Sequence, residues 1–281
     1  MSRTIIVTGG SMGIGKAVAE RCLRGGANVF FCAREKGALE RTLDELQAEF
    51  PSMVGAETAD ISREQDVTRL FESARRRFGD VHAVIHAAAV LGPIGTIVDV
   101  DPRDWLRTIE IDLFGAFLVA REACRQMKST GGRIVLFSGG GASAALPHYS
   151  AYASSKAAVV RLTETIAGEM AQFGIEINCL APGFVITRMH EQTLAAGSSV
   201  AGEEYYERTK REVEAGGASP DAAAEAAAFL ASDAAKGITG KFVSAVYDGW
   251  REWPAHASQL RASDIFTLRR IVPKDRGMDW Q

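Results

Sequence analysis

Short apolar runs alternate with longer stretches of helical periodicity along most of the chain. The first run, TIIVT at 4–8, is rich in β-branched residues, as expected of a strand buried on both faces of a parallel sheet. Similar runs lie at 28–32, 53–58, 81–86, 132–137, 176–180 and 241–246, and helical stretches at 14–24, 35–50, 62–78, 101–127, 151–173 and 220–230. This alternation predicts right-handed βαβ units and an α/β fold: a doubly wound, parallel, seven-stranded sheet in three α/β/α layers.

Capping chemistry predicts where two of these helices begin. Ser62 precedes Gln65 at capping-box spacing, so we expect Ser62 to be the N-cap of the third helix. Ser219 precedes Pro220, a residue that favours the first helical position.

Two segments fit no strand or simple helix pattern. Residues 188–217 are polar and punctuated by glycines, which predicts either a lid segment or a pair of surface helices. Residues 254–281 follow a main domain at 1–253 and carry five basic and three acidic residues beside apolar clusters. We expect this extension to dock on the domain or on a neighbouring subunit; a solvent-exposed tail is the alternative.

Composition narrows the class of protein. The 281 residues are 47% hydrophobic and 24% charged, so the chain can bury a full core. The net charge of −3 lacks the basic excess of nucleic-acid-binding proteins, and no apolar run is long enough to span a membrane. We therefore expect the chain to bind neither nucleic acid nor a membrane. The four scattered cysteines and the N-terminal sequence favour reduced thiols, no metal site and a cytoplasmic location.

A glycine-rich turn, Thr8–Gly15, lies between the first strand and the first helix. Glycines there permit positive φ and close approach of backbone N–H groups to a pyrophosphate, and the helix N-terminus favours an anion. The pattern therefore predicts a dinucleotide site, with a purely structural tight turn as the alternative.

Tyr152 and Lys156 are four residues apart on a predicted helix and therefore share one face. A phenol titrates near pH ~10, too high for a base at neutral pH, and an adjacent ammonium lowers that pKa. The pair therefore predicts a tyrosine general acid and base.

The TGxxxGxG turn and the YxxxK pair together resemble the short-chain dehydrogenase/reductase family, in its single-domain branch of about 250 residues, from Thr4 to about Gly249. The resemblance implies a Rossmann-type fold, an NAD(P)(H) cofactor and interconversion of a small-molecule carbonyl and a secondary alcohol. The cofactor contacts it implies are Gly9, Ser11, Met12, Gly13, Ile14, Gly15, Arg34, Asp60, Ile61, Ala87, Ala88, Tyr152, Lys156, Pro182, Gly183, Val185 and Thr187.

The residues directly after the second strand indicate whether the chain binds NAD(H) or NADP(H). An acid there would bond a ribose 2′-OH, but Ala33 occupies that position and Arg34 follows. We therefore expect NADP(H) in preference to NAD(H), with a solvated Arg34 as the alternative. The resemblance assigns Asp60 to the adenine amino group; an N-cap role before the third helix is its alternative.

The third catalytic position is less regular. Relatives mostly carry a serine thirteen residues before the tyrosine, where this chain has Gly139, and Ser138 precedes it. We predict Ser138 as the catalytic serine, with Ser143 or a serine-deficient site as alternatives. Asp112 stands where relatives often have an asparagine, whose backbone carbonyl holds a water beside the lysine. The Asp112 carboxylate would stabilise the Lys156 cation, with another charged partner as the alternative. His86 replaces the first residue of an Asn-Asn-Ala-Gly segment and is expected to be structural or to contact the cofactor.

The substrate pocket is expected at the carboxyl ends of the strands. Candidate lining residues are Leu91, His148, Met189 and His190, although a satisfied loop role is an alternative for His148. The resemblance also implies a homotetramer or homodimer built on the helices at 101–127 and 151–173. A dinucleotide-binding regulator and a non-redox epimerase or dehydratase on the same fold are the alternatives to an oxidoreductase.

Overall fold

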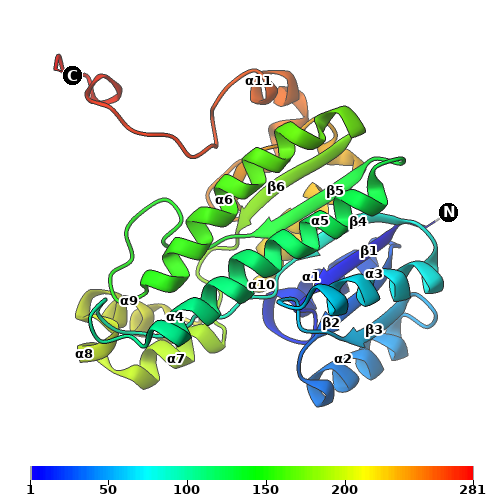
Figure 1. Cartoon of the computed structure of the whole chain (residues 1–281), viewed down its shortest axis with the longest axis horizontal. Coiled ribbons are helices and arrows are strands. Elements are labelled where there is room, and N and C mark those ends of the chain that lie inside the picture. Colours follow the sequence, from blue (N-terminus) through cyan, green and yellow to red (C-terminus); the bar gives the residue numbers. More distant parts are fainter. Residues whose placement is uncertain (1, 281) are drawn as a thin grey trace.

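The computed structural model describes residues 2–280 and contains one seven-stranded sheet (Figure 1). All neighbouring strands are parallel, in the order β3-β2-β1-β4-β5-β6-β7. The bounds are β1 Thr4–Thr8, β2 Asn28–Ala33, β3 Val54–Thr58, β4 Val81–His86, β5 Gly132–Phe137, β6 Ile175–Ala181 and β7 Phe242–Ser244. The predicted doubly wound parallel sheet is confirmed, although β7 is shorter than the predicted 241–246.

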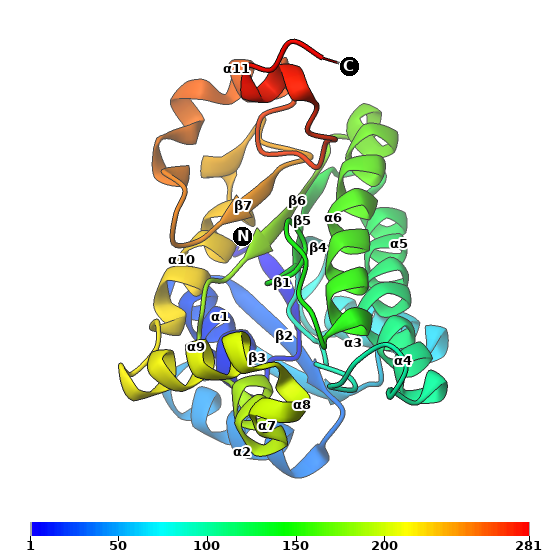
Figure 2. The ribbon, with the colours of Figure 1, turned by 90° about the vertical axis from the view of Figure 1, so that its left-hand side faces the viewer.

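Helices cover both faces of this sheet, and further short helices lie at opposite ends of the molecule (Figures 1 and 2). Their bounds are α1 Gly13–Arg24, α2 Lys36–Glu49, α3 Glu64–Phe78, α4 Pro102–Ile109, η1 Glu110–Phe114, α5 Gly115–Met127, α6 Ser150–Met170, η2 Ala171–Phe173, α7 Arg188–Ala196, α8 Ser198–Ala201, α9 Glu203–Glu214, α10 Pro220–Leu230, η3 Asp233–Ala235, η4 Trp250–His256, α11 Ala257–Arg261 and η5 Pro273–Arg276.

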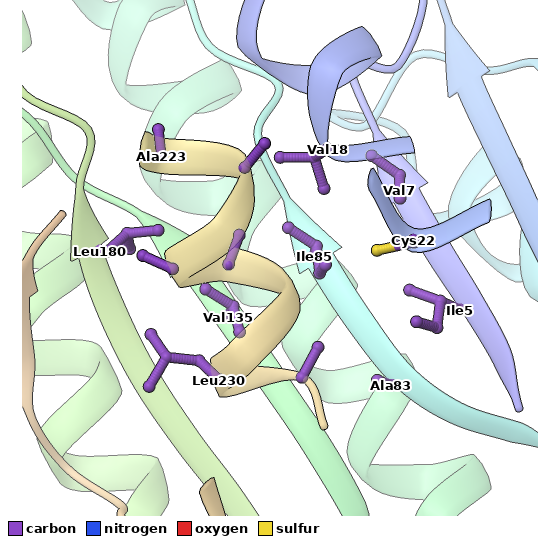
Figure 3. Close-up of a cluster of buried hydrophobic side chains, with 14 of the residues drawn as sticks. Ile5, Val7, Val18, Cys22, Ala83, Ile85, Val135, Leu180, Ala223 and Leu230 are labelled. Carbon is purple, nitrogen blue, oxygen red and sulfur yellow. The ribbon is translucent and has the colours of Figure 1, made fainter. Parts of the chain in front are cut away.

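Two apolar cores lie on opposite faces of the sheet. On one face α1, α2 and α10 pack on alternate strand residues, including Val7, Ile85 and Val135 (Figure 3). On the other face α3, α5 and α6 pack on the intervening positions, such as Ile6, Val84 and Ile134. Because strand side chains alternate between faces, continuous apolar runs supply both cores.

The third helix begins later than its sequence pattern predicts. Its N-cap is Arg63, which makes no side-chain capping bond, so the assignment of Ser62 as N-cap is wrong. Ser62 instead donates from both its backbone N–H and its hydroxyl to Asp60 Oδ1. The prediction for Ser219 is confirmed, because its hydroxyl accepts from the Asp221 N–H at 3.1 Å.

A π-helical turn interrupts the helix predicted at 101–127. The segment η1, Glu110–Phe114, separates α4 from α5 and contains the buried residues Ile111 and Asp112. A π turn inserts one extra residue and thereby changes which side chains face the core. Here it accompanies the burial of an acidic residue in the middle of an otherwise amphipathic helix.

The segment 188–217 is an insertion between β6 and α10 that forms three short helices, α7, α8 and α9. The residues that flank this segment lie side by side. Val185 and Ala218 form an isolated parallel bridge, and the Ala218 N–H donates to Phe184 O at 3.0 Å. In Figure 2 these helices lie together at the end of the molecule where α6 begins.

The C-terminal segment runs along the outer edge of the sheet. The Phe242 N–H of β7 donates to Phe266 O at 2.7 Å, and Lys241 Nζ donates to the carbonyls of Ser263 and Ile265, each at 2.9 Å. The ring of Phe266 lies 4.5 Å from that of Trp253. These contacts cover the hydrogen-bonding edge of β7, which would otherwise be exposed.

All four cysteines are buried and free. Within residues 2–280, no helix is long and apolar enough to cross a bilayer. The same residues contain no cluster of three or more side chains suited to holding a metal ion.

Candidate active site

A cleft of about 1740 Å³ opens at the carboxyl ends of the strands. It spans the point between β1 and β4 where the strand order reverses, the usual ligand position in doubly wound sheets. The predicted residues that line it are Gly9, Ser11, Met12, Gly13, Ile14, Gly15, Arg34, Ile61, Ala87, Ala88, Leu91, Ser138, Tyr152, Lys156, Pro182, Gly183, Val185, Thr187, Met189 and His190. Asp60, Asp112 and His148 do not line it.

The glycine turn leaves no room for side chains on its inner side. A Cβ on Gly15 would lie 2.2 Å from Gly9 O, and one on Gly9 would lie 2.9 Å from the backbone of Ala88. Gly13 has a positive φ of 52°, and a Cβ there would meet nothing closer than Thr187 Cγ2 at 3.9 Å. This bare backbone at the start of α1 fits a pyrophosphate, so the residues present suit a dinucleotide.

Arg34 and Asp60 flank the part of the cleft beyond β2 and β3. Arg34 is exposed, lines the cleft, and has no carboxylate within ion-pair distance among residues 2–280. Burial alone would raise the pKa of Asp60, but its carboxylate accepts from Ser62 and pairs with Arg107 at 3.1 Å, and these contacts lower that pKa. The neighbouring Ile61 lines the cleft, whereas Asp60 does not line it and its carboxylate already bonds Ser62 and Arg107.

His86 joins the ends of β1 and β4. Its Nδ1 lies 2.8 Å from the Thr8 hydroxyl, which also accepts from the Ala88 N–H at 3.3 Å. Burial, with a smaller contribution from the Lys156 charge, lowers the pKa of His86 to about 3. This histidine is therefore a neutral group that ties two strands together beneath the cleft.

Tyr152 and Lys156 lie on the first turns of α6 and face the cleft together. Lys156 Nζ is 5.5 Å from the centroid of the Tyr152 ring and 3.4 Å from Phe137 O. Burial raises the pKa of the Tyr152 phenol, and the nearby Asp112 charge raises it further. The tyrosine is therefore a neutral hydrogen-bond donor at physiological pH.

Asp112 forms a buried ion pair with Lys156. Its Oδ2 lies 3.7 Å from Lys156 Nζ, and neither side chain is more than 3% exposed. Asp112 Oδ1 accepts from the Val90 N–H at 2.8 Å, and Oδ2 accepts from the Ser155 hydroxyl at 3.3 Å. Burial raises the pKa of Asp112, an effect that Lys156 and these two donors oppose.

Ser138 and Gly139, the two positions considered for the catalytic serine, have different surroundings. Ser138 is buried, and its hydroxyl donates to Lys156 O at 3.1 Å, which ties β5 to α6. Gly139 faces the tyrosine instead: a Cβ there would lie 2.3 Å from the Tyr152 hydroxyl oxygen. Ser143, the fallback candidate, is exposed and lines the cleft.

Residues from the loop after β6 and from α7 form the opposite wall. Thr187 caps α7 with His190, whose Nδ1 accepts from the Thr187 N–H at 3.2 Å. The His190 ring packs on Phe184 at 4.1 Å, and burial lowers its pKa. His148 has a positive φ of 69° and packs against Gly202 of the segment 188–217.

Known proteins are similar to this chain in sequence and in fold. A family model described as enoyl-(acyl carrier protein) reductase matches residues 9–249. The human dehydrogenase/reductase SDR family member 4 is 31% identical over 243 residues, covering 86% of this chain and 85% of the relative. The chain belongs to the short-chain dehydrogenase/reductase family.

Two further comparisons agree with this membership. The 2-(S)-hydroxypropyl-CoM dehydrogenase 3 of Xanthobacter autotrophicus is 31% identical over 241 residues, covering 85% of this chain and 93% of the relative. A variant of actinorhodin polyketide ketoreductase solved with NADPH superposes with a TM-score of 0.79 at 29% identity, covering 86% of this chain and 95% of the other. This short-chain dehydrogenase/reductase is therefore a nicotinamide-dependent oxidoreductase of carbonyl and alcohol groups.

Two side chains of this short-chain dehydrogenase/reductase site are not among the individually predicted site residues, although Tyr205 lies in the segment expected to be a lid or surface helices. Ser155 bonds the Asp112 carboxylate, and its place directly before Lys156 gave no sign of that contact. Tyr205 of α9 lines the cleft and packs in one apolar cluster with Tyr152. Its aromatic character in a charged segment was a signal, but the fold of residues 188–217 was needed to place it.

Proposed function

We propose that this enzyme interconverts a small-molecule ketone or aldehyde and its alcohol, with NADP(H) preferred and Tyr152 as the general acid and base. The single observation that carries the proposal is the Tyr152–Lys156 pair, which lines the same cleft as the bare glycine turn. Proton transfer and dinucleotide binding therefore belong to one site.

Tyr152 would donate its phenolic proton to the substrate oxygen during reduction and accept it back during oxidation. The Lys156 ammonium, 5.5 Å from the ring, stabilises the phenolate that forms when the proton leaves. The Phe137 carbonyl and the Asp112 carboxylate hold that ammonium in place. Ser138 supports the same geometry through its bond to the Lys156 carbonyl, which favours a positioning role over polarisation of the substrate oxygen.

The glycine turn, Ile61, the Ala87–Ala88 segment and residues 182–187 would hold the dinucleotide along the cleft. Arg34, an exposed cation on the cleft wall without a carboxylate partner among residues 2–280, would pair with a 2′-phosphate. When bound, the nicotinamide supplies or accepts the hydride. The Leu91, Leu146 and Met189 side chains exclude water from the space beside Tyr152 and favour a substrate with an apolar body.

A panel of ketones and aldehydes, each mixed with NADPH or NADH and followed by cofactor absorbance, tests this function. We expect oxidation of NADPH with at least one carbonyl compound and slower oxidation of NADH. Tight binding of either dinucleotide without hydride transfer to any compound would contradict the proposal and favour a regulatory protein.

Self-association would use the helical face formed by α5. Phe114 and Phe117 are both exposed, and their rings stack at 5.9 Å on the outer surface. The apolar side chains of Val159, Ile166 and Met170 on α6 are not available for this purpose, because they pack into the core. We propose a homodimer through the Phe114–Phe117 surface, which sedimentation of Phe117→Glu would test.

A further inference from the structure

Reduction of a carbonyl places negative charge on the substrate oxygen, and two hydrogen-bond donors stabilise that charge better than one. Tyr152 supplies one donor. Directly after β5, Gly139 has no side chain and the Ser138 hydroxyl is bonded to the Lys156 carbonyl, so Ser143 is the remaining hydroxyl of this loop on the cleft wall. Neither of the two positions directly after β5 therefore supplies the second donor.

Helix α9, in the segment 188–217, carries a candidate for that donor. Tyr205 lines the cleft with Tyr152, and both rings pack against the same buried cluster of Leu91, Tyr149 and Ala201. The hydrogen bonds within residues 2–280 include neither the Tyr152 nor the Tyr205 hydroxyl. Two phenols without a hydrogen bond from their hydroxyls thus line one cleft and pack on one cluster.

Packing holds the Tyr205 ring in a fixed orientation. It meets the Tyr149 ring edge-on at a centroid distance of 4.9 Å and an interplanar angle of 65°. Tyr149 is fully buried, and its hydroxyl lies 3.2 Å from Thr193 Oγ1 of α7. The lid helices α7 and α9 are therefore locked to the start of α6, the turn that carries Tyr152.

The electrostatic surroundings keep Tyr205 protonated. Burial raises the pKa of its phenol, and proximity to Tyr152 raises it further, while Arg208 opposes the shift. A neutral phenol donates a hydrogen bond at physiological pH, as a second donor to a developing oxyanion requires.

We propose that Tyr205 is a further catalytic residue, which donates the second hydrogen bond to the substrate oxygen beside Tyr152. This inference rests on the proposed function and deepens it. It also gives the lid a chemical role, because the catalytic pair is complete only when α9 lies against the start of α6.

The test compares Tyr205→Phe with Tyr206→Phe in the full-length enzyme. Tyr206 is the adjacent phenol and packs in the same cluster but does not line the cleft, so its variant controls for the loss of a hydroxyl from α9. We expect Tyr205→Phe to lower kcat by about 10²-fold, the usual effect of removing one oxyanion donor. Tyr206→Phe should stay within about twofold of the wild type, because its hydroxyl does not reach the substrate.

Two further readouts separate chemistry from structure. The NADPH dissociation constant, measured by cofactor fluorescence, should be the same in both variants, and so should the melting temperature. The pH at which the Tyr205→Phe rate changes should equal that of the wild type, because the donor does not set the Tyr152 pKa. If Tyr205→Phe instead unfolds, Tyr205→Gln, which retains a donor, should restore part of kcat.

Equal rates for Tyr205→Phe and Tyr206→Phe, with Tyr152→Phe inactive, would overturn this inference and leave the proposed function intact. Full activity of Tyr152→Phe would overturn the proposed function itself.

Discussion

Replacement of Asp112 by asparagine removes a buried negative charge from beside the Lys156–Tyr152 pair with almost no change in side-chain size. The amide oxygen of the new side chain would still accept from the Val90 N–H, so the loop after β4 stays in place. The Asp112 carboxylate raises the Tyr152 pKa, and its loss must therefore lower that pKa. Tyrosine in the variant becomes a phenolate at lower pH than in the wild type.

The structure sets the size of this effect. Asp112 Oδ2 is 3.7 Å from Lys156 Nζ, which is 5.5 Å from the Tyr152 ring centroid, so charge and ring are at most about 9 Å apart. One unit charge at about 9 Å and an effective dielectric constant of about 20 contributes roughly 1.8 kcal/mol, or about 1.3 pKa units. The shift should therefore be about one unit or slightly more.

The assay is the initial rate of alcohol oxidation as a function of pH, because oxidation needs the phenolate. We expect the rising limb of the Asp112→Asn profile to lie about one unit below that of the wild type. Glu110→Gln is the matched control: it removes a carboxylate from the same π segment, but a half-exposed one that pairs with Arg107. A limb that stays in place, moves to higher pH, or moves equally in the control would refute the electrostatic reasoning.

Three other variants test separate parts of the account. Arg34→Ala should weaken NADPH binding by about tenfold or more, since charge-assisted hydrogen bonds contribute about 1.5–3 kcal/mol, and leave the NADH dissociation constant unchanged; equal losses for both cofactors would contradict a 2′-phosphate contact. Gly15→Ala should abolish NADPH binding, because the new Cβ would meet the Gly9 carbonyl at 2.2 Å, whereas Gly168→Ala on α6 meets nothing and should retain it. Lys241→Met should lower the free energy of unfolding by about 2–3 kcal/mol through loss of two hydrogen bonds to the C-terminal segment, and an unchanged denaturation midpoint would show that this segment contributes little.

Local sequence patterns were sufficient to predict most of the fold. The β-branched runs and glycine turns predicted the strands of the sheet, and each strand begins and ends close to its predicted bounds. The pattern could not predict the π turn at 110–114, because helical periodicity does not mark an extra residue; this turn accompanies the burial of Asp112 beside Lys156. Ser62 failed as an N-cap for a similar reason: Asp60, two residues earlier, accepts its hydrogen bonds.

Some features of the candidate site could likewise be predicted from local spacing, whereas others depend on contacts between distant segments. The Gly9–Gly15 turn and the Tyr152–Lys156 pair combine short-range spacing with a fixed place in the fold, so both were predictable. The position of Tyr205 depends on how α7, α8 and α9 pack on Tyr149, a contact between segments with no shared periodicity. The orientation of Ser138 likewise depends on a bond to the α6 backbone, which no count of residues reveals.

The central claim is that Tyr152 transfers the proton while the rest of the site holds the cofactor. Single-turnover reduction of an active carbonyl substrate by Tyr152→Phe, with the NADPH dissociation constant measured on the same sample, tests this claim most directly. We expect the rate of hydride transfer to fall by about 10²–10⁴-fold with the dissociation constant unchanged. Hydride transfer at the wild-type rate in Tyr152→Phe would contradict the account.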